Sequence, residues 1–350
     1  MLRFFPRTFR SGLLAGAALA VAVAAAAITY ERYDTQTLKR TVRRGELLCG
    51  VSTGLPGFSM PDDKGNWTGF DVDICRAIAA AIFNDPGKVR FVSLDANERF
   101  TELQKRKIDV LSRNSTWSMS RETNYALNFA AVSYYDGQGF MLRKSRNIDS
   151  GLELDGSKVC VQESTTTQLN LSDYFRANNI KYQEIKFARA DDVVKAYESD
   201  RCDVFTADVS QLYSQRIRLS KPDDHVILAD VISKEPLAPV VRQKDDDWLL
   251  IVKWTVYAML NAEELGITSK NIDEALKSSK PEVMRLVGTE GSYGEQLGLA
   301  KDWAARIVRH VGNYGEVYER NLGTGSKLGI PRGMNQLWSA GGIQYAPPIR

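Results

Sequence analysis

Histidine is scarce in this sequence, and its cysteines are not closely paired. Among the 350 residues the only histidines are His225 and His310, and none of the four cysteines stands in a Cys-x-x-Cys pair. Zinc sites are built mainly from closely spaced cysteine and histidine residues, so we expect no metal site. We expect no other cofactor either.

The chain also lacks an excess of one charge once its N-terminus is set apart. It has 46 basic and 43 acidic side chains, and three of the arginines, Arg3, Arg7 and Arg10, precede the first acidic residue, Glu31. The remaining charges are balanced. A nucleic-acid-binding domain carries a basic excess, so we expect no nucleic-acid partner.

The N-terminus carries a long uncharged run instead. Residues 11–28 follow the three arginines, contain several Ala-x-Ala frames and precede a polar segment. This pattern predicts a signal peptide over residues 1–28, a connector over 29–45 and export to the periplasm. A retained membrane anchor is the alternative, because 18 apolar residues reach the lower limit of a span. Alanine and glycine insert weakly, which favours the signal peptide.

Strand and helix patterns alternate twice along the chain, with the periodicity of a parallel sheet covered by helices. In the first half, strands are predicted at 46–52, 89–94 and 108–111, and helices at 71–83 and 98–107. In the second half, strands are predicted at 158–162, 182–187 and 202–206, and helices at 169–178 and 191–199. We therefore expect an α/β protein with two lobes, each a mostly parallel sheet flanked by helices.

The two halves also match in detail at one strand. Residues 107–114 (KIDVLSRN) align with residues 201–208 (RCDVFTAD), which places Asn114 and Asp208 at equivalent strand ends. Ligands of open parallel sheets bind beyond the carboxyl ends of the strands. The sequence therefore predicts one cleft lined by the strand ends of both lobes.

Two connecting segments, 139–144 and 237–242, predict a two-strand hinge. On this interpretation lobe 1 comprises 46–140 and 241–350, and lobe 2 comprises 141–240. Helical patterns at 248–260, 271–287 and 296–310 return to lobe 1. The glycine- and proline-rich residues 321–350 are expected to wrap the surface.

Four cysteines, Cys49, Cys75, Cys160 and Cys202, suit an oxidising compartment. Three pairings are possible. We favour Cys49–Cys75, because the first strand lies under the first helix, and Cys160–Cys202, because their strands are neighbours in the predicted sheet. Four buried free thiols are the alternative.

Several segments resemble one known family. Residues 69–82 (GFDVDICRAIAAAI) resemble the signature of bacterial extracellular solute-binding proteins for polar amino acids, family 3. The resemblance continues through GVSTGLPGFS, DVLSRNSTWSMSRETNY, YYDGQGF, VCVQESTTTQLN and RCDVFTAD. It is greatest to the broad-specificity members that bind L-amino acids for ABC uptake systems. It implies a type II periplasmic-binding-protein fold and a monomer that captures free L-amino acids by hinge closure and delivers them to an inner-membrane permease.

The resemblance also implies roles for individual residues. Arg121 matches the clamp for the ligand α-carboxylate, with Thr116 and Ser118 as nearby donors, and its guanidinium suits a bidentate carboxylate. The alternative is a surface ion pair with Glu122. Ser164 and Thr165 open a helix whose N–H groups could hold the same carboxylate. Glu163 departs from the family pattern, which usually has glycine there because glycine lets the backbone approach the ligand closely at Ser164.

Asp208 matches the family's acceptor for the α-ammonium, and Asn114 is its counterpart in lobe 1. A strand-end cap is the alternative for Asp208. Phe58 and Trp67 are candidates for a wall over the ligand or for core residues. Arg113 could meet an acidic ligand side chain or be solvated.

Two other functions remain open. A dehydratase-type enzyme uses a related scaffold, but the predicted cleft segments contain no histidine and no clear nucleophile–base pair. A membrane-tethered amino-acid sensor would keep residues 11–28. We expect a binding protein rather than an enzyme.

Overall fold

The computed structural model describes residues 36–350. The predicted signal peptide, 1–28, and residues 29–35 of the predicted connector lie outside this range. The rest of the connector contains helix α2 (Thr37–Arg44), which ends at Gly45 in a left-handed conformation. The carboxylate of Asp245 accepts a hydrogen bond of 2.7 Å from the backbone N–H of Thr37. This contact fixes the start of α2 to the rest of the chain.

In the first sheet four strands run in one direction and one, β14 (Val240–Arg242), runs against them. Strands β4 (Val89–Leu94), β1 (Leu47–Ser52) and β5 (Val110–Leu111) are parallel, as the sequence predicted. Strands β14 and β6 (Leu127–Phe129) complete the order β4-β1-β5-β14-β6. These two have only three residues each, too few for a period of two to be recognised.

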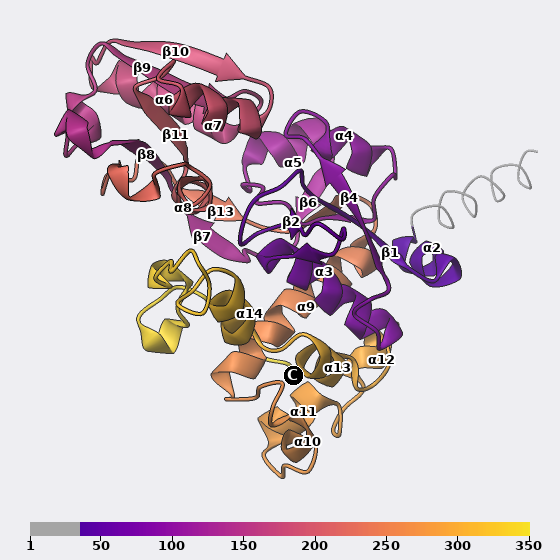
Figure 1. Cartoon of the computed structure of the whole chain (residues 1–350). Helices are drawn as coiled ribbons and strands as arrows, with labels where there is room; N and C mark the ends of the chain where they lie inside the picture. Colours follow the sequence, from indigo (N-terminus) through magenta and orange to yellow (C-terminus); the bar gives the residue numbers. More distant parts are fainter. Residues whose placement is uncertain (1–35) are drawn as a thin grey trace, which may run out of the picture.

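Helices cover this sheet, and the C-terminal third packs against them (Figure 1). Helix α3 (Phe70–Phe83) buries its apolar face, for example at Ile78, and contacts α9 (Asp246–Glu264) and α13 (Trp303–His310). Helix α4 (Arg99–Gln104) contacts β5, and α5 (Met119–Tyr125) contacts β6. The C-terminal third also contains α10 (Ile272–Ala275), α11 (Pro281–Val287), α12 (Tyr293–Gln296) and α14 (Tyr314–Asn321). The long helical segments expected at 271–287 and 296–310 are therefore broken. Pro281 begins α11, where its missing N–H costs nothing.

The second sheet repeats the plan. Its order is β10 (Tyr182–Phe187), β9 (Ser157–Gln162), β11 (Val204–Asp208), β8 (Gln138–Arg143) and β12 (His225–Ile227). The first three are parallel, β8 runs antiparallel to β11, and β12 pairs antiparallel with β8 at the edge. Helices α6 (Thr166–Ala177), α7 (Ala190–Glu198) and α8 (Val209–Arg216) flank this sheet. The predicted link at 139–144 is thus part of the second sheet.

Two short strands join the sheets. Strand β7 (Tyr134–Asp136) pairs antiparallel with β13 (Glu235–Leu237) between the two lobes (Figure 1). The protein therefore has the two-lobed α/β architecture of a type II periplasmic binding protein with a two-strand hinge. The lobe limits at residues 140 and 241 stay a prediction. A further hairpin, β2 (Met60–Pro61) and β3 (Trp67–Thr68), lies beside α3.

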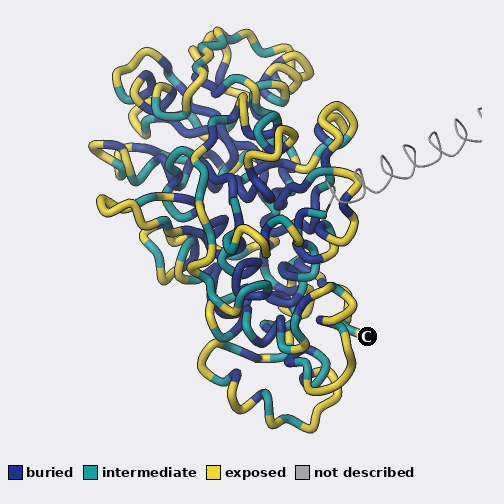
Figure 2. Tube along the Cα trace, turned by 90° about the vertical axis from the view of Figure 1, so that its right-hand side faces the viewer, coloured by how far each residue is buried: buried dark blue, intermediate teal, exposed yellow. Residues whose placement is uncertain are grey.

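The C-terminal tail, residues 321–350, also contacts the hinge. The side chain of Asn335 accepts a hydrogen bond of 2.7 Å from the N–H of Tyr135 and donates one of 3.0 Å to its carbonyl. Gln344 and Tyr314 both donate to the carbonyl of Ser133. Figure 2 shows buried segments running through the centre of both lobes, with exposed loops around them.

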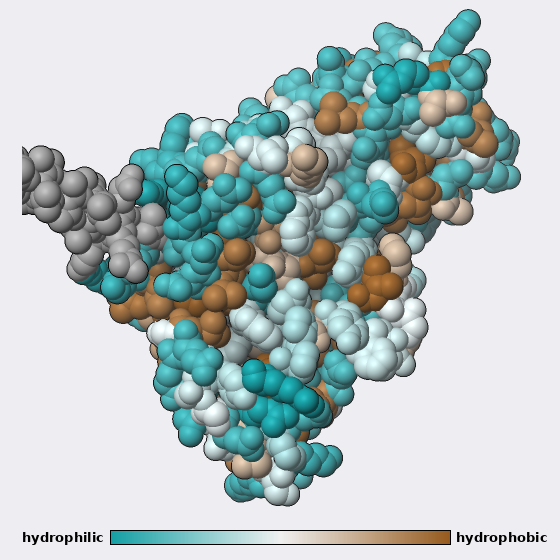
Figure 3. Space-filling model, turned by 180° about the vertical axis from the view of Figure 1, so that it is seen from behind, coloured by the Kyte–Doolittle hydropathy of each residue, from teal (hydrophilic) through white to brown (hydrophobic). Residues whose placement is uncertain are grey.

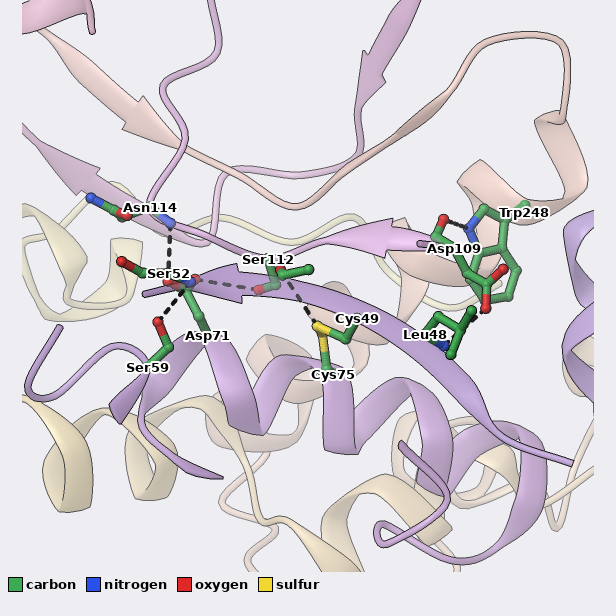
Figure 4. Close-up of a disulfide and its surroundings, with 11 residues drawn as sticks. Leu48, Cys49, Ser52, Ser59, Asp71, Cys75, Asp109, Ser112, Asn114 and Trp248 are labelled. Atoms are coloured by element: carbon green, nitrogen blue, oxygen red, sulfur yellow. Dashed lines mark hydrogen bonds between the residues drawn. A yellow bond between two sulfur atoms is a disulfide. The ribbon is translucent and has the colours of Figure 1, made fainter. Parts of the chain in front are cut away.

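Both favoured disulfides are present. Cys49 on β1 is bonded to Cys75 on α3, with their Cα atoms 6.3 Å apart, and Cys160 on β9 is bonded to Cys202, with a Cα separation of 5.6 Å. Both separations lie in the usual range. Figure 4 shows the first bond crossing from the sheet to the helix beneath it. The pairing expected from neighbouring elements is confirmed.

Candidate functional site

A polar pocket lies where the strand ends of the two sheets face each other. From the first sheet it is lined by Ser52 at the end of β1, by Asn114 after β5, and by Leu55, Arg99, Arg113, Thr116 and Arg121. From the second sheet it is lined by Gln162 at the end of β9, by Asp208 at the end of β11, and by Thr165, Thr166, Thr167, Gln211 and Gln215. The rule that ligand sites lie at carboxyl strand ends therefore locates this pocket.

Asp71 in the first turn of α3 holds the loop that carries Asn114. Its carboxylate accepts hydrogen bonds from the N–H of Asn114 at 2.9 Å and from the hydroxyl of Ser112 at 3.3 Å (Figure 4). Burial raises the pKa of Asp71 to about 6, and both hydrogen bonds oppose that shift. Asn114 itself has a φ of 25°, a left-handed conformation that asparagine tolerates better than most residues. The first acidic residue of the GFDVD motif thus shapes one wall of the pocket.

Arg121 reaches the pocket from α5 and is 7% exposed. Its Nη1 donates a hydrogen bond of 2.7 Å to the carbonyl of Thr116. Across residues 36–350 no carboxylate forms an ion pair with it, so the alternative pairing with Glu122 is not found. Burial lowers the pKa of Arg121, and Glu235 and Asp208 oppose this. Its guanidinium therefore lines the pocket and donates only one hydrogen bond within the described residues.

Asp208 is buried opposite, with 5% exposure. It stands at the N-cap position of α8, yet its side chain makes no capping hydrogen bond, and its Oδ1 has no partner among the described residues. Burial raises its pKa well above the ordinary value, Asp136 and Glu235 add to this, and Arg121 and Arg99 oppose it. A helix cap does not explain this carboxyl group. Its Oδ1 is free to accept a hydrogen bond.

The start of α6 supplies neutral donors. Thr165 is the N-cap: its hydroxyl accepts from the N–H of Gln168 at 3.2 Å and donates to the carbonyl of Gln162 at 2.6 Å. Ser164 has a φ of 61° and is exposed, and it does not line the pocket. The neighbours Thr166 and Thr167 line the pocket instead. A twelve-residue helix that begins here presents free N–H groups to an anion.

Three other predicted residues lie away from the pocket lining. The hydroxyl of Ser118 lies 3.3 Å from that of Ser120 at the start of α5. Phe58 is a core residue with 1% exposure that packs edge-on against Phe70 and Tyr134. Trp67 lies on β3 beside Phe91. The structure therefore brings together Asn114, Thr116, Arg121, Thr165 and Asp208 of the predicted set.

Glu235 was not predicted, and it joins both lobes at the pocket. It lies on hinge strand β13 and is 1% exposed. One carboxylate oxygen accepts from the hydroxyls of Thr116 in the first lobe and Thr166 in the second, the latter at 2.8 Å. The other oxygen accepts from Asn170 and Ser233, each at 2.7 Å. Four neutral donors thus hold one buried carboxylate across the hinge.

The surface seen in Figure 3 is mostly hydrophilic, with apolar groups in several separate places. Within residues 36–350, no helix combines the length and the hydropathy needed to cross a membrane.

Comparisons with known proteins agree with this geometry. The general L-amino acid-binding periplasmic protein AapJ of Rhizobium johnstonii is 53% identical over 342 residues, which is 97% of this chain and 98% of that protein. The glutamate/glutamine/aspartate/asparagine-binding protein BztA of Rhodobacter capsulatus is 47% identical and covers 97% of this chain and 99% of its own length. Both are similar to this chain over almost their whole length.

A solved structure is similar over most of the chain. The periplasmic binding protein from Brucella ovis with glutathione bound is 52% identical, with a TM-score of 0.89, and covers 90% of this chain and 99% of that one. The model of the bacterial extracellular solute-binding proteins, family 3, matches residues 47–272. This chain therefore belongs to the family 3 bacterial extracellular solute-binding proteins.

Proposed function

We propose that this protein captures a free L-amino acid between its lobes and delivers it to an ABC permease in the inner membrane. One observation carries the proposal. The pocket places a buried guanidinium, Arg121, and a buried carboxyl group, Asp208, on opposite lobes, and neither has an ion-pair partner within the described chain. The names of the relatives, which are amino-acid-binding proteins of transport systems, support the same function.

A zwitterion matches these two groups. We infer that Arg121 and the N-terminus of α6 hold the α-carboxylate, because the hydroxyl of Thr116 already donates to Glu235. Asp208 and Asn114 hold the α-ammonium. Charge-assisted hydrogen bonds are stronger than neutral ones, and a buried charge that finds its partner no longer suffers the penalty of being unpaired. Because the two groups come from different lobes, binding both ends of the ligand favours closure.

The relatives also support an exported protein. AapJ is described as periplasmic, and we propose a cleaved signal peptide over residues 1–28, a periplasmic location and a monomer. The relatives are binding proteins rather than enzymes, and we propose binding without catalysis.

The test is calorimetric titration of the purified protein with the common L-amino acids. Arg121→Ala and Asp208→Asn each remove a charged hydrogen-bonding group. Such groups contribute about 1.5 to 3 kcal/mol, so we expect affinity to fall roughly tenfold or more. Arg90→Ala is the control, because Arg90 is 59% exposed and pairs with Glu46 on the surface. Unchanged affinity in both folded variants would contradict the proposed clamp. A protein that binds no amino acid would contradict the function itself.

A further inference from the structure

One buried guanidinium in the pocket has no role in the proposed capture of a zwitterion. Arg99 begins α4, lines the pocket and is 3% exposed. Its Nε is fully buried without a partner, and no hydrogen bond or ion pair links its side chain to any residue of the described part of the chain. Its guanidinium carbon lies 4.8 Å from the centre of its neighbour's ring, that of Phe100. A charge this buried needs a partner.

The surroundings of Arg99 increase this need. Burial lowers its pKa well below the ordinary value, and the positive charges of Arg113 and Arg121 add to the effect. The guanidinium carbon of Arg121 lies 5.2 Å from the ring of Phe100, so Arg99 and Arg121 contact the same side chain. Asp208 opposes the shift. However, Asp208 is already assigned to the ligand ammonium.

Arg113 differs from Arg99 in having partners within its own lobe. Its Nε donates a hydrogen bond of 2.9 Å to the carbonyl of Leu94, and Asp71 and Asp95 favour its charged form. The excess positive charge of the pocket is therefore concentrated at Arg99. A ligand that supplied only a carboxylate and an ammonium would leave this charge unpaired.

We propose that Arg99 determines specificity by binding a second carboxylate of the ligand. This inference rests on the proposed function. The ligand would be an α-amino acid that carries a further carboxylate at some distance from the first. Arg99 would repel a ligand with a cationic side chain. A neutral amide could accept a hydrogen bond from Arg99 but would leave its charge unpaired. Two sources have the required chemistry: a free acidic amino acid, and a γ-glutamyl peptide such as glutathione.

The experiment compares Arg99→Gln with the unaltered protein by calorimetry, using L-glutamate, L-glutamine and glutathione as probes. Glutamate and glutamine share the zwitterion and differ only in the distal charge. We expect Arg99→Gln to lower the affinity for glutamate about tenfold or more, because a charged hydrogen bond is lost, and to change the affinity for glutamine by less than about threefold. If the peptide is the ligand, glutathione shows the selective loss instead of glutamate.

Thermal unfolding adds a second readout. Removing an unpaired buried charge should raise the melting temperature of the unliganded Arg99→Gln variant, whereas the exposed control Arg90→Gln should leave both binding and melting unchanged. If Arg99→Gln does not fold, Arg99→Lys serves for the same comparison, because it keeps the charge and loses the planar fork. It should weaken glutamate binding and spare glutamine binding.

Two results would overturn this inference without touching the proposed function. One is an equal loss of affinity for all three probes, which would place Arg99 at the zwitterion or give it a purely structural role. The other is an unchanged ratio of glutamate to glutamine affinity in a folded variant. In contrast, a failure of the unaltered protein to bind any of the three would count against the proposed function.

Discussion

Three carboxyl groups are buried close together at the hinge end of the pocket. Asp136 on β7 accepts hydrogen bonds from the hydroxyl and N–H of Ser210 and from the N–H of Gly137. Asp208 and Glu235 are the other two, and the charges of Asp136 and Glu235 both raise the pKa of Asp208. Burial raises the pKa of Asp136 to about 6, and Glu235 adds to this. Ionising Asp136 therefore costs folding free energy.

This cost predicts a pH dependence of stability. The pKa of Asp136 is higher in the folded protein than its ordinary value of 3.8. Burial therefore imposes no penalty below about pH 4, where Asp136 is protonated in both the folded and the unfolded protein. As the pH rises towards 6, the free energy of unfolding falls by about 3 kcal/mol. Asp136→Asn removes the titration. We expect the difference in free energy of unfolding, variant minus unaltered protein, to rise between pH 4 and 6 and to be flat above. Urea unfolding at several pH values measures it, and a pH-independent difference would contradict it.

The sequence revealed only part of the site at this scale. Arg121 and Asp208 were predicted because each stands in a motif that matches a known pattern. Arg99 and Glu235 were missed, because their importance lies in what surrounds them after folding. A buried arginine without an acceptor looks, in sequence, like any arginine at the start of an amphipathic helix. Because ligands bind beyond the carboxyl ends of parallel strands, the loop after β4 could have been examined as a site, and this loop leads to Arg99.

At the scale of elements, the six parallel strands and the helices between them were predicted, and the strands that pair antiparallel, including the six-residue β8, were not. Residues 89–94 and 182–187 matched strands β4 and β10 without change. Strands β6, β7, β12, β13 and β14 have three residues each, and they exist because a neighbouring strand pairs with them. Tertiary pairing of this kind leaves little local pattern. Hence the hinge could be located only roughly.

The hinge strand β13 gives a second prediction through Glu235. Its carboxylate accepts from Thr116 of one lobe and Thr166 of the other, so separating the lobes removes at least one hydrogen bond from a charged group. Glu235→Gln can accept through only one oxygen, which weakens the closed form by about 1.5 kcal/mol or more. We expect amino-acid affinity to fall by roughly tenfold, by the same factor for glutamate and glutamine, because Glu235 acts on closure.

A matched control and an opposite outcome define this test. Glu153→Gln makes the same chemical change at an exposed position of the second lobe, and calorimetry should show no effect. Loss confined to one amino acid would mean that Glu235 contacts the ligand side chain. Full affinity in a folded Glu235→Gln variant would remove its assignment to closure.

In the whole molecule, the segment that joins the two lobes also contacts the C-terminal tail. The C-terminal tail binds the hinge backbone at Ser133 and Tyr135 through Gln344 and Asn335. This tail lies beyond residue 272, where the match to the family model ends. This contact could not be predicted, because single side-chain hydrogen bonds to a distant backbone have no sequence pattern. The tail therefore contributes to the hinge rather than only wrapping the surface.

The last prediction concerns opening and closing. The pocket has a volume of about 30 Å³, and one water molecule needs about 10 to 15 Å³ on this measure, so an amino acid requires a more open arrangement to enter. In solution we expect small-angle X-ray scattering to give a smaller radius of gyration with saturating ligand than without it, because the ligand binds groups from both lobes. Arg121→Ala at the same ligand concentration should stay expanded. Identical scattering curves for the unaltered protein, at a ligand concentration where calorimetry shows full occupancy, would mean that capture needs no closure. The charges on opposite lobes would then have to meet the ligand by side-chain movement alone.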